Sequence, residues 1–335
     1  MIYLPRIINL INEVMKNKMW VLMALPLLFS CNRRSHVQFS NPYSITVDSE
    51  NNIYVLDCTS VIRKIQKTSV NTMFGRHGYL PENEIIQIIS IDVNTIIAIH
   101  RTFIESISQD GKTKLIAGDK KFRGFSEATG GEARFGWIGE AVVTSYHSII
   151  IIDYDNKAIR EIMLDGSNKI ICKNRITLNN GTSIEIKPEL LAINQKTNDL
   201  YFDDGSINAI IKLDRKSGVF YLIASHPKTY DGYSADGIVK PYKMLVASDD
   251  NLVLGGNGVL IKLSLSGVQQ LCGRQGELDF RNGDPKTTRL NGFIDFCVYN
   301  KNELLLLDSH AIRKMDQAGN TTTLIGKPGS PGCWE

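Results

Sequence analysis

Four aspartates recur where short apolar runs end, and they are the first residues in this sequence with a type and spacing that could do chemistry. They are Asp57, Asp153, Asp203 and Asp308. Carboxylates that converge on one point can bind a cation. An Asp side chain also accepts backbone N–H groups in turns. Repetition at equivalent places is typical of a scaffold, so the sequence favours a structural role for this set.

Histidines would be needed for a metal-dependent reaction, and the chain has six. His100 and His310 follow corresponding apolar runs. Two imidazoles without a third ligand make a poor catalytic zinc site, which normally has three protein ligands. The motifs G-x-S-x-G, H-E-x-x-H and G-x-x-x-x-G-K are absent from the sequence. We therefore expect no catalytic residues, no metal ligands and no cofactor.

A module of four short apolar segments positions these residues, and it is clearest from Pro42 to Gly75. Its third segment has two apolar residues around a polar pair. This segment recurs at 62–65, 104–107, 159–162, 210–213, 260–263 and 312–315. Six copies about 50 residues apart are typical of propeller blades. We predict an all-β, six-bladed β-propeller of four-stranded antiparallel blades over residues 41–327.

The blade sequences resemble NHL repeats. Segments such as YVLD or LLLLD, then IRK, then LIAG or LIG carry the resemblance, together with the glycine-rich lead GFSEATGGEARF at 124–135. His100, Glu105 and the pair at 255–256 depart from the pattern. The resemblance implies that the linkers between blades emerge on the same face as the turns after the second strands. It implies little about function, because this architecture hosts receptors, RNA binders, scaffolds and lyases.

Basic and aromatic side chains are concentrated in the linkers between blades. Such side chains on a rigid face serve interface hot spots and sites that stack sugars. The candidate binding residues are Lys120, Arg123, Phe125, Tyr230, Tyr233 and Arg281. The alternative is that linker aromatics such as Phe122 fill gaps between blades, which is the role that we favour for Trp137.

The N-terminus has the pattern of a secretory signal. Lys16 and Lys18 precede an uncharged run, 19–30, that is too short to span a bilayer as a helix. LLFSC, ending at Cys31, resembles a bacterial lipobox. The resemblance implies a signal peptide at 1–30, with Met15 an alternative start, and a lipidated Cys31 on a tether, 31–40. Cleavage of an ordinary signal peptide nearby is the alternative.

The residues after Cys31 give an expected location. Asn32-Arg33-Arg34 is not an acidic export signal, so we expect an anchor in the outer membrane that faces the periplasm. Several acyl chains give a stable anchor. Residues 37–39 are a candidate edge strand that joins the first blade to the last, and 328–335 form a C-terminal tail.

The net charge limits the kinds of partner that we expect, and the cysteine content limits the possible disulfides. The formal net charge is +3, and loss of 1–30 would leave a nearly neutral chain. Such a chain lacks the basic footprint of a nucleic-acid binder, so we expect no nucleic-acid partner. Five cysteines remain after Cys31, with no C-x-x-C spacing. Closure of the ring would make only Cys58 and Cys297 a pair worth testing, and we expect mostly free, buried thiols.

These observations favour a lipid-anchored binding module of the cell envelope. Its expected partners are the membrane, through Cys31, and an unidentified protein, peptide or glycan. The alternatives are a metal-dependent lyase or lactonase-type hydrolase on the same fold, and a structural envelope component.

Overall fold

The computed structural model describes residues 39–67, 69–75, 84–229, 237–291, 293–301 and 303–327. All of them belong to the unit Val37–Glu335. Tyr230, Tyr233, Cys31 and the tail 328–335 lie outside the described residues, so the predictions that concern them stay predictions.

The described residues form six antiparallel sheets, each built from consecutive strands. Blade one has β1 (Pro42–Val47), β2 (Ile53–Asp57), β3 (Val61–Gln66) and β4 (Ser69–Phe74). Blade two has β5 (Ile85–Ser90), β6 (Thr95–His100), β7 (Phe103–Ser108) and β8 (Thr113–Gly118). Blade three has β9 (Ile138–Val143), β10 (Ile149–Asp153), β11 (Ala158–Ile162) and β12 (Asn168–Lys173), preceded by a short 3-10 helix, η1 (Gly130–Glu132).

The second half of the chain continues the same order. Blade four has β15 (Pro188–Ile193), β16 (Leu200–Asp204), β17 (Ala209–Asp214) and β18 (Val219–Ser225). Blade five has β19 (Lys243–Val246), β20 (Leu252–Gly256), β21 (Val259–Ser264) and β22 (Gly267–Gly273). Blade six has β23 (Phe293–Asn300), β24 (Glu303–Asp308), β25 (Ala311–Met315) and β26 (Thr321–Gly326). The predicted six-bladed β-propeller is confirmed.

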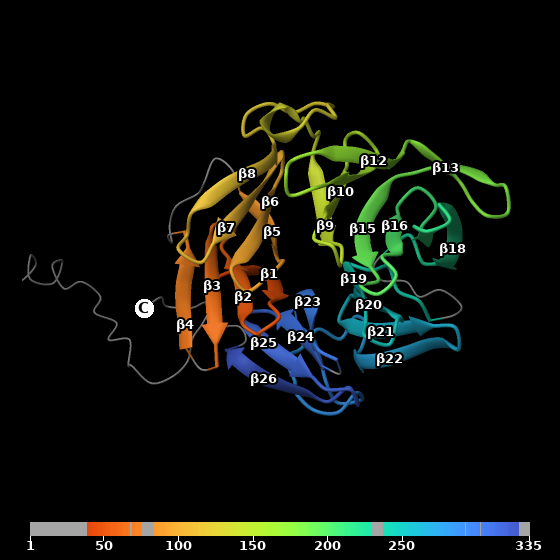
Figure 1. The fold of residues 1–335 in the computed structure, drawn as a ribbon. Coiled ribbons are helices and arrows are strands. Elements are labelled where there is room, and N and C mark those ends of the chain that lie inside the picture. The colour runs from red at the N-terminus through yellow and green to blue at the C-terminus, as the bar shows by residue number, and fades with distance from the viewer. Residues whose placement is uncertain are drawn as a thin grey trace, which may run out of the picture. The chain divides into compact units, whose positions relative to one another are not determined.

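The first strands close the ring. β1 contacts β5, and contacts continue from β5 to β9, β15, β19, β23 and back to β1. Figure 1 shows these strands toward the middle of the propeller, with the fourth strands at its periphery. The turns after the second strands and the linkers between blades lie on one face, here called the linker face. The other turns form the opposite turn face.

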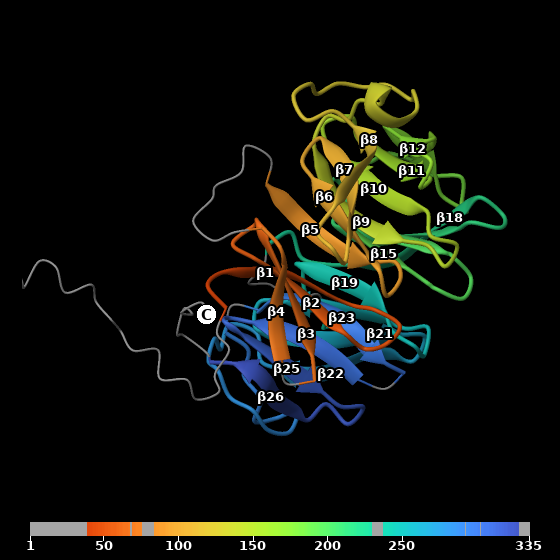
Figure 2. The same cartoon turned by 60° about the vertical axis from the view of Figure 1, so that its left-hand side comes forward.

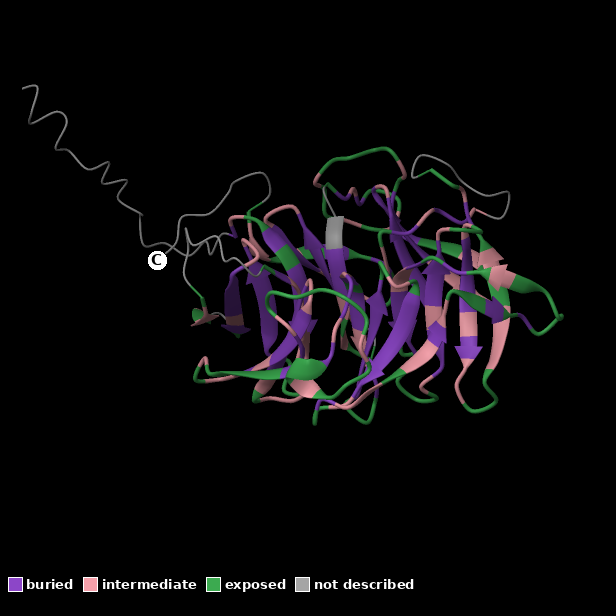
Figure 3. Ribbon diagram, turned by 90° about the horizontal axis from the view of Figure 1, so that it is seen from above, coloured by how far each residue is buried: buried purple, intermediate pink, exposed green. Residues whose placement is uncertain are grey.

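Burial between blades explains the apolar runs. Six hydrophobic clusters each join one blade to the next, and the cluster between blades six and one closes the series. The second strands lie inside their sheets with a neighbouring blade on each side, so every residue of β2, β10 and β20 is buried. Such strands read as continuous apolar runs instead of alternating ones. Figure 3 shows buried residues along the strands and exposed residues in the loops.

Phe39 contributes to closure in a way that differs from the prediction. It belongs to no strand, so it does not extend the edge of a sheet. Its side chain is fully buried among residues of blade one, such as Val55, and of blade six, such as Leu305. The aromatic ring therefore wedges the first blade against the last. Val37 and Gln38 lie outside the described residues.

Blade three departs from four strands. β13 (Arg175–Thr177) and β14 (Ser183–Glu185) form a hairpin that extends its sheet to six strands. Ile176 and Leu178 from this hairpin join the cluster between blades three and four. Leu178 also forms a parallel bridge with Phe220 of blade four. The hairpin thus covers the outer side of one blade interface.

The described cysteines are free thiols. Cys58, Cys172, Cys272 and Cys297 form no disulfide, so the candidate bridge between Cys58 and Cys297 is wrong and the expectation of free thiols is confirmed for them. Burial raises the pKa of Cys172 and of Cys272 to about 12, which keeps both protonated and unreactive.

Candidate functional site

The recurring aspartates hold the beginnings of their own blades. Their carboxylates accept backbone N–H groups that lie just before the first strand, from Asn41 to Asp57, from Gly136 to Asp153 and from Asn291 to Asp308. In blade four the equivalent residue is Asp204, because it pairs with Pro188 and accepts the N–H of Lys187 at 2.7 Å. The alignment that placed Asp203 in this set is wrong by one residue. The donors lie about 17 residues earlier in the chain, not in the same turn as expected.

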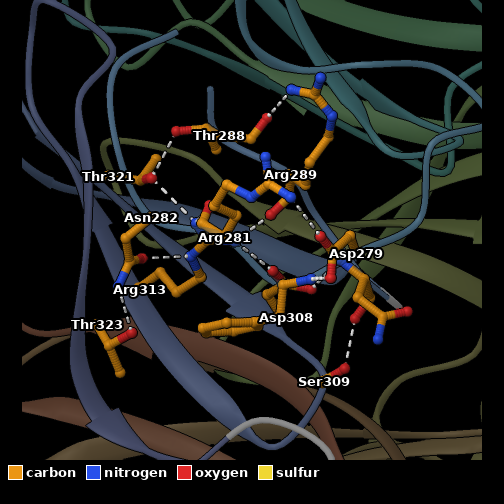
Figure 4. A network of polar contacts seen from close by, with 12 residues as sticks. Asp279, Arg281, Asn282, Thr288, Arg289, Asp308, Ser309, Arg313, Thr321 and Thr323 are labelled. Carbon is orange, nitrogen blue, oxygen red and sulfur yellow. Dashed lines mark hydrogen bonds and ion pairs between the residues drawn. The ribbon is translucent and has the colours of Figure 1, made fainter. Parts of the chain in front are cut away.

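A buried arginine secures the linker before blade six (Figure 4). Arg313 is 2.7 Å from Asp308, and both side chains are fully buried. The same guanidinium donates to the carbonyl oxygens of Arg289 at 2.7 Å and Arg281 at 2.5 Å. The ring of Phe280 lies over it, with 4.5 Å between its centroid and the guanidinium carbon. The linker is therefore folded onto the third strand of the blade that it leads into.

Arg160 does the same in blade three. It is 3.1 Å from Asp153 and donates to the carbonyl oxygens of Arg134 and Ser126 at 2.8 and 2.5 Å. Phe125 corresponds to Phe280, with its centroid 5.3 Å from the Arg160 guanidinium. Phe125 remains 40% exposed, so it covers the arginine and still presents surface. The glycine-rich segment before blade three therefore helps to stabilise the fold.

The predicted binding residues do not all gather in one place. Lys120, Arg123 and Phe125 share the linker between blades two and three, whereas Arg281 lies on the linker before blade six. The Arg281 guanidinium is 60% exposed and pairs with Asp279 at 3.2 Å, so its role in the fold comes from its backbone oxygen.

Residues 120–125 (Lys-Lys-Phe-Arg-Gly-Phe) form an exposed stretch that we call the basic–aromatic loop. The loop has a defined backbone, because Asp119 accepts the N–H groups of Lys121 at 2.8 Å and Phe122 at 3.0 Å. Phe122 is 63% exposed, so the alternative that it fills a gap between blades is wrong. Figure 2 shows the linker that carries this loop and η1 projecting beyond β8 and β12. Sequence reasoning did not select Phe122 as a binding residue, because its exposure depends on how the linker folds.

Trp137 connects the basic–aromatic loop to the body of the propeller. The guanidinium carbons of Arg101 and Arg123 lie 4.7 and 5.4 Å from its ring centroid. The ring is half-buried, and the Trp137 carbonyl accepts the N–H of Tyr154 at 2.8 Å. Cations over an aromatic face are attracted to it. Trp137 therefore packs at the blade boundary, as favoured, and also orients Arg123.

His100 is committed to a buried pair with Glu105. Its Nε2 is 3.2 Å from Glu105 Oε1, and its ring stacks on Phe103 at 3.9 Å. Lys120 Nζ lies 3.6 Å from the other carboxylate oxygen. Burial favours protonation of Glu105, but His100 and then Lys120 outweigh it and lower the pKa of this carboxyl. His100 thus takes the place of Asp153 in the repeat, and Glu105 that of Arg160.

A second histidine pair lies in blade four. His226 Nε2 is 2.5 Å from Asp203 Oδ1, and Nδ1 is 2.8 Å from the carbonyl oxygen of Pro227. Both ring nitrogens face acceptors, which is the arrangement of an imidazolium. Burial opposes this charge, but the Asp203 carboxylate outweighs it and raises the pKa of His226. The pair anchors the start of the linker that carries Tyr230 and Tyr233.

The centre of the propeller has a polar layer that the sequence reasoning missed. Equivalent positions of the six first strands hold Ser44, Gln87, Glu140, Leu190, Lys243 and Asp295. Four of these side chains accept a backbone N–H from the next blade around the ring. The donor and acceptor pairs are Ile88 to Ser44, Ala141 to Gln87, Leu191 to Glu140 and Ile45 to Asp295. A first strand is the edge of its sheet, so these buried N–H groups need partners outside the ladder.

Lys243 joins this layer across the ring. Its Nζ is 2.6 Å from Glu140 of blade three and 3.5 Å from Asp295 of blade six. Burial favours the neutral amine, but the two carboxylates outweigh it and raise the pKa of Lys243. Burial raises the pKa of Glu140 in turn, against the effect of Lys243. The signal that could have identified the layer is a polar residue two positions after the start of the first strand in four blades, at Ser44, Gln87, Glu140 and Asp295.

No three His, Cys, Asp or Glu side chains converge as metal ligands in the part of the chain that the structure describes. These residues therefore form an exposed basic–aromatic loop on one face and a polar layer inside the ring.

Comparison with known proteins supports the architecture and no more. No family model matches this sequence, and no curated protein does. A protein of unknown function from Bacteroides thetaiotaomicron matches with a TM-score of 0.60 at 14% identity, over 85% of this chain and 69% of that chain. A virginiamycin B lyase from Staphylococcus aureus matches with a TM-score of 0.51 at 14% identity, over 86% and 85%.

An auxiliary nutrient binding protein from Bacteroides thetaiotaomicron also matches, with a TM-score of 0.50 at 12% identity, over 86% of this chain and 64% of that chain. Such low identities establish the β-propeller fold alone, because one fold serves many functions. Among the described residues, no helix has the length and apolar character that crossing a bilayer requires.

Proposed function

We propose that this protein is a lipid-anchored binding module of a bacterial cell envelope and that it binds a protein or peptide through the linker face. The observation that carries the proposal is the basic–aromatic loop, in which three cations and two phenylalanines are exposed on a hydrogen-bonded backbone. Aromatic residues and arginine dominate the energetics of protein interfaces. A preformed loop loses less conformational entropy on binding than a flexible one.

The charges on the loop favour an acidic partner. Lys120, Lys121 and Arg123 are exposed, and Trp137 holds Arg123 in place. A cationic loop attracts acidic segments over a distance set by ionic strength. Phe122 supplies the apolar contact that a purely electrostatic surface lacks. The other predicted residues, Tyr230, Tyr233 and Arg281, belong to the same proposal on neighbouring linkers.

Partner binding is tested by pull-down from envelope extracts with quantitative mass spectrometry. Phe122→Ala and Arg123→Ala are the test variants, and Leu265→Ala is the matched control, because Leu265 is fully exposed in a turn of the opposite face. The proposal expects proteins retained by the wild type and the control to be lost from both test variants. Equal retention by all four proteins contradicts it, and a glycan partner is indicated if glycosidase treatment of the extract abolishes retention.

The anchor rests on the sequence around Cys31, which resembles a lipobox. Its test is detergent phase partition of cell extracts combined with mass spectrometry of the N-terminal peptide. Wild-type protein is expected in the detergent phase with acyl chains on Cys31, and Cys31→Ser protein in the aqueous phase. Wild-type protein in the aqueous phase with an unmodified Cys31 would remove the anchor but leave the binding proposal standing.

The alternative of a metal-dependent lyase or lactonase-type hydrolase depended on His100 and the recurring aspartates, and three of these aspartates bind backbone N–H groups of their own blades. The His100 side chain is stacked on Phe103 and bonded to Glu105, and no observation in the described residues favours a reaction over binding. We therefore keep binding as the proposed function.

A further inference from the structure

A cavity of about 580 Å³ occupies the centre of the propeller. It lies between the turn face and the polar layer that contains Lys243. Residues from the first strands of all six blades line it. Its lining also includes Ser145, His147 and Gln195, which lie in or next to turns of that face. The cavity therefore lies away from the basic–aromatic loop. Concave sites of this size are where proteins bind small molecules.

The wall of the cavity combines aliphatic side chains with polar ones such as Ser90 and Thr144. Its apolar lining includes Ile89, Val143, Ile193, Leu245 and Val298. The single phenylalanine in the lining, Phe296, is only 2% exposed. The aliphatic side chains gain free energy by covering hydrocarbon. The body of a matching ligand is therefore aliphatic.

The inner end of the cavity is polar and carries unused hydrogen-bonding capacity. Lys243, Asp295 and Gln87 line it. An ammonium group has three N–H donors. Lys243 lies 2.6 Å from Glu140 and 3.5 Å from Asp295, so each carboxylate engages one of its donors. One donor remains for an acceptor that enters from the cavity.

The charges at this end select against a charged head group. A carboxylate would approach Lys243 but also Asp295 and, behind the lysine, Glu140. A second ammonium would approach Lys243. Either charge would also lose its hydration shell. A primary amide avoids both costs, because its carbonyl accepts from Lys243 while its NH₂ donates to Asp295 or Gln87.

We propose that the central cavity binds a small neutral aliphatic molecule through an amide-type head group held by Lys243 and Asp295. This site is separate from the linker face and does not depend on the partner proposed above. The ligand lies with its hydrocarbon along Val143 and Val298 and its head group at the polar layer.

The test compares three probes that share a six-carbon chain: hexanamide, hexanoate and hexylamine. Isothermal titration calorimetry with the purified whole protein at pH 7 measures each affinity. Hexanamide is expected to bind at least about tenfold more tightly than either charged probe, the equivalent of one charge-assisted hydrogen bond. Equal or tighter binding of a charged probe overturns the proposal, and so does the absence of hexanamide binding.

Two variants locate the site. Lys243→Met removes the donor and should weaken hexanamide binding about tenfold. Because this change leaves Glu140 and Asp295 without their cation, Val298→Phe provides a second variant that fills the cavity and spares the layer. Lys216→Ala, in an exposed turn outside the cavity lining, is the control and should bind like the wild type. Undiminished binding by Val298→Phe contradicts the location.

Discussion

His100 and Glu105 repeat the buried acid–base pair of blade three with the positions of the acid and the base exchanged. In blade three the carboxylate ends the second strand and the guanidinium lies on the third, whereas in blade two the imidazole ends the second strand and the carboxylate lies on the third. The pair is 3.2 Å apart in blade two and 3.1 Å in blade three. Blades two and three therefore share a pairing of opposite groups at these positions, although neither residue is the same.

Exchanging both residues should restore the pairing that exchanging one destroys. His100→Asp alone sets two carboxylates side by side, and Glu105→Arg alone sets a guanidinium beside the imidazole. Each single variant is expected to lower the free energy of unfolding by about 2–4 kcal/mol, as for other broken buried pairs. The loss of unfolding free energy in the double variant should be smaller than the sum of the two single losses by at least about 1 kcal/mol. Urea denaturation of the four proteins measures this coupling, and strictly additive losses would refute it.

Arg313 and Arg281 provide a matched pair of arginines on one linker. Arg313→Met removes the buried partner of Asp308 and the donors to two linker carbonyls, at an expected cost of about 3–5 kcal/mol. Arg281→Met removes an exposed guanidinium and keeps the backbone oxygen that Arg313 binds, so its effect should stay within about 0.5 kcal/mol. Thermal and urea unfolding compare them. Similar losses in both variants would mean that the guanidinium of Arg313 does not secure the linker.

Phe39 should matter to the stability of the ring although it precedes the first strand. Phe39→Ala leaves a cavity between blades one and six and is expected to cost about 3–5 kcal/mol. Tyr43→Ala is a suitable control, because Tyr43 lies close in sequence and is 47% exposed. Urea denaturation separates the two. A Phe39→Ala variant as stable as the control would show that closure does not need this side chain.

His226 should make stability depend on pH above the usual histidine range. Its folded-state pKa is raised, so its contribution is fully present below pH 6.5 and is lost as pH rises through the folded-state pKa. The free energy of unfolding of the wild type should therefore exceed that of His226→Gln most at pH 5.5. The difference should be smaller at pH 7.5 and smaller still at pH 9. Denaturant titrations at the three values measure the margin. A margin that grows with pH would mean that the imidazole is neutral in the folded protein.

The repeat could be recognised in the sequence because every blade must bury its inner strands against its neighbours. Each second strand is buried on both faces, which produces runs such as Ile149–Asp153. Each third strand has apolar residues on both sides of a central pair in which at least one residue is polar. Those demands act within a blade and leave a local pattern. Blades two and five followed the pattern weakly in sequence, yet they pair in the same register as the others.

The candidate sites were harder to predict because they depend on contacts between blades. Nothing near Lys243 in the sequence indicates that its partners are Glu140 and Asp295, each at least 50 residues away. Phe125 and Phe122 are close neighbours in a linker, but one covers a buried arginine and the other faces solvent. Residue type alone cannot separate these outcomes, because they follow from how the linker folds onto Arg160.

The central claim is that the basic–aromatic loop contacts the partner. Photo-crosslinking in living cells tests it most directly, with a photoreactive phenylalanine analogue placed at Phe122 or, as a control on the opposite face, at Leu265. A discrete crosslinked product is expected from position 122, and it should be absent from position 265 and reduced by Arg123→Ala. No product from position 122, or the same product from both positions, would contradict it.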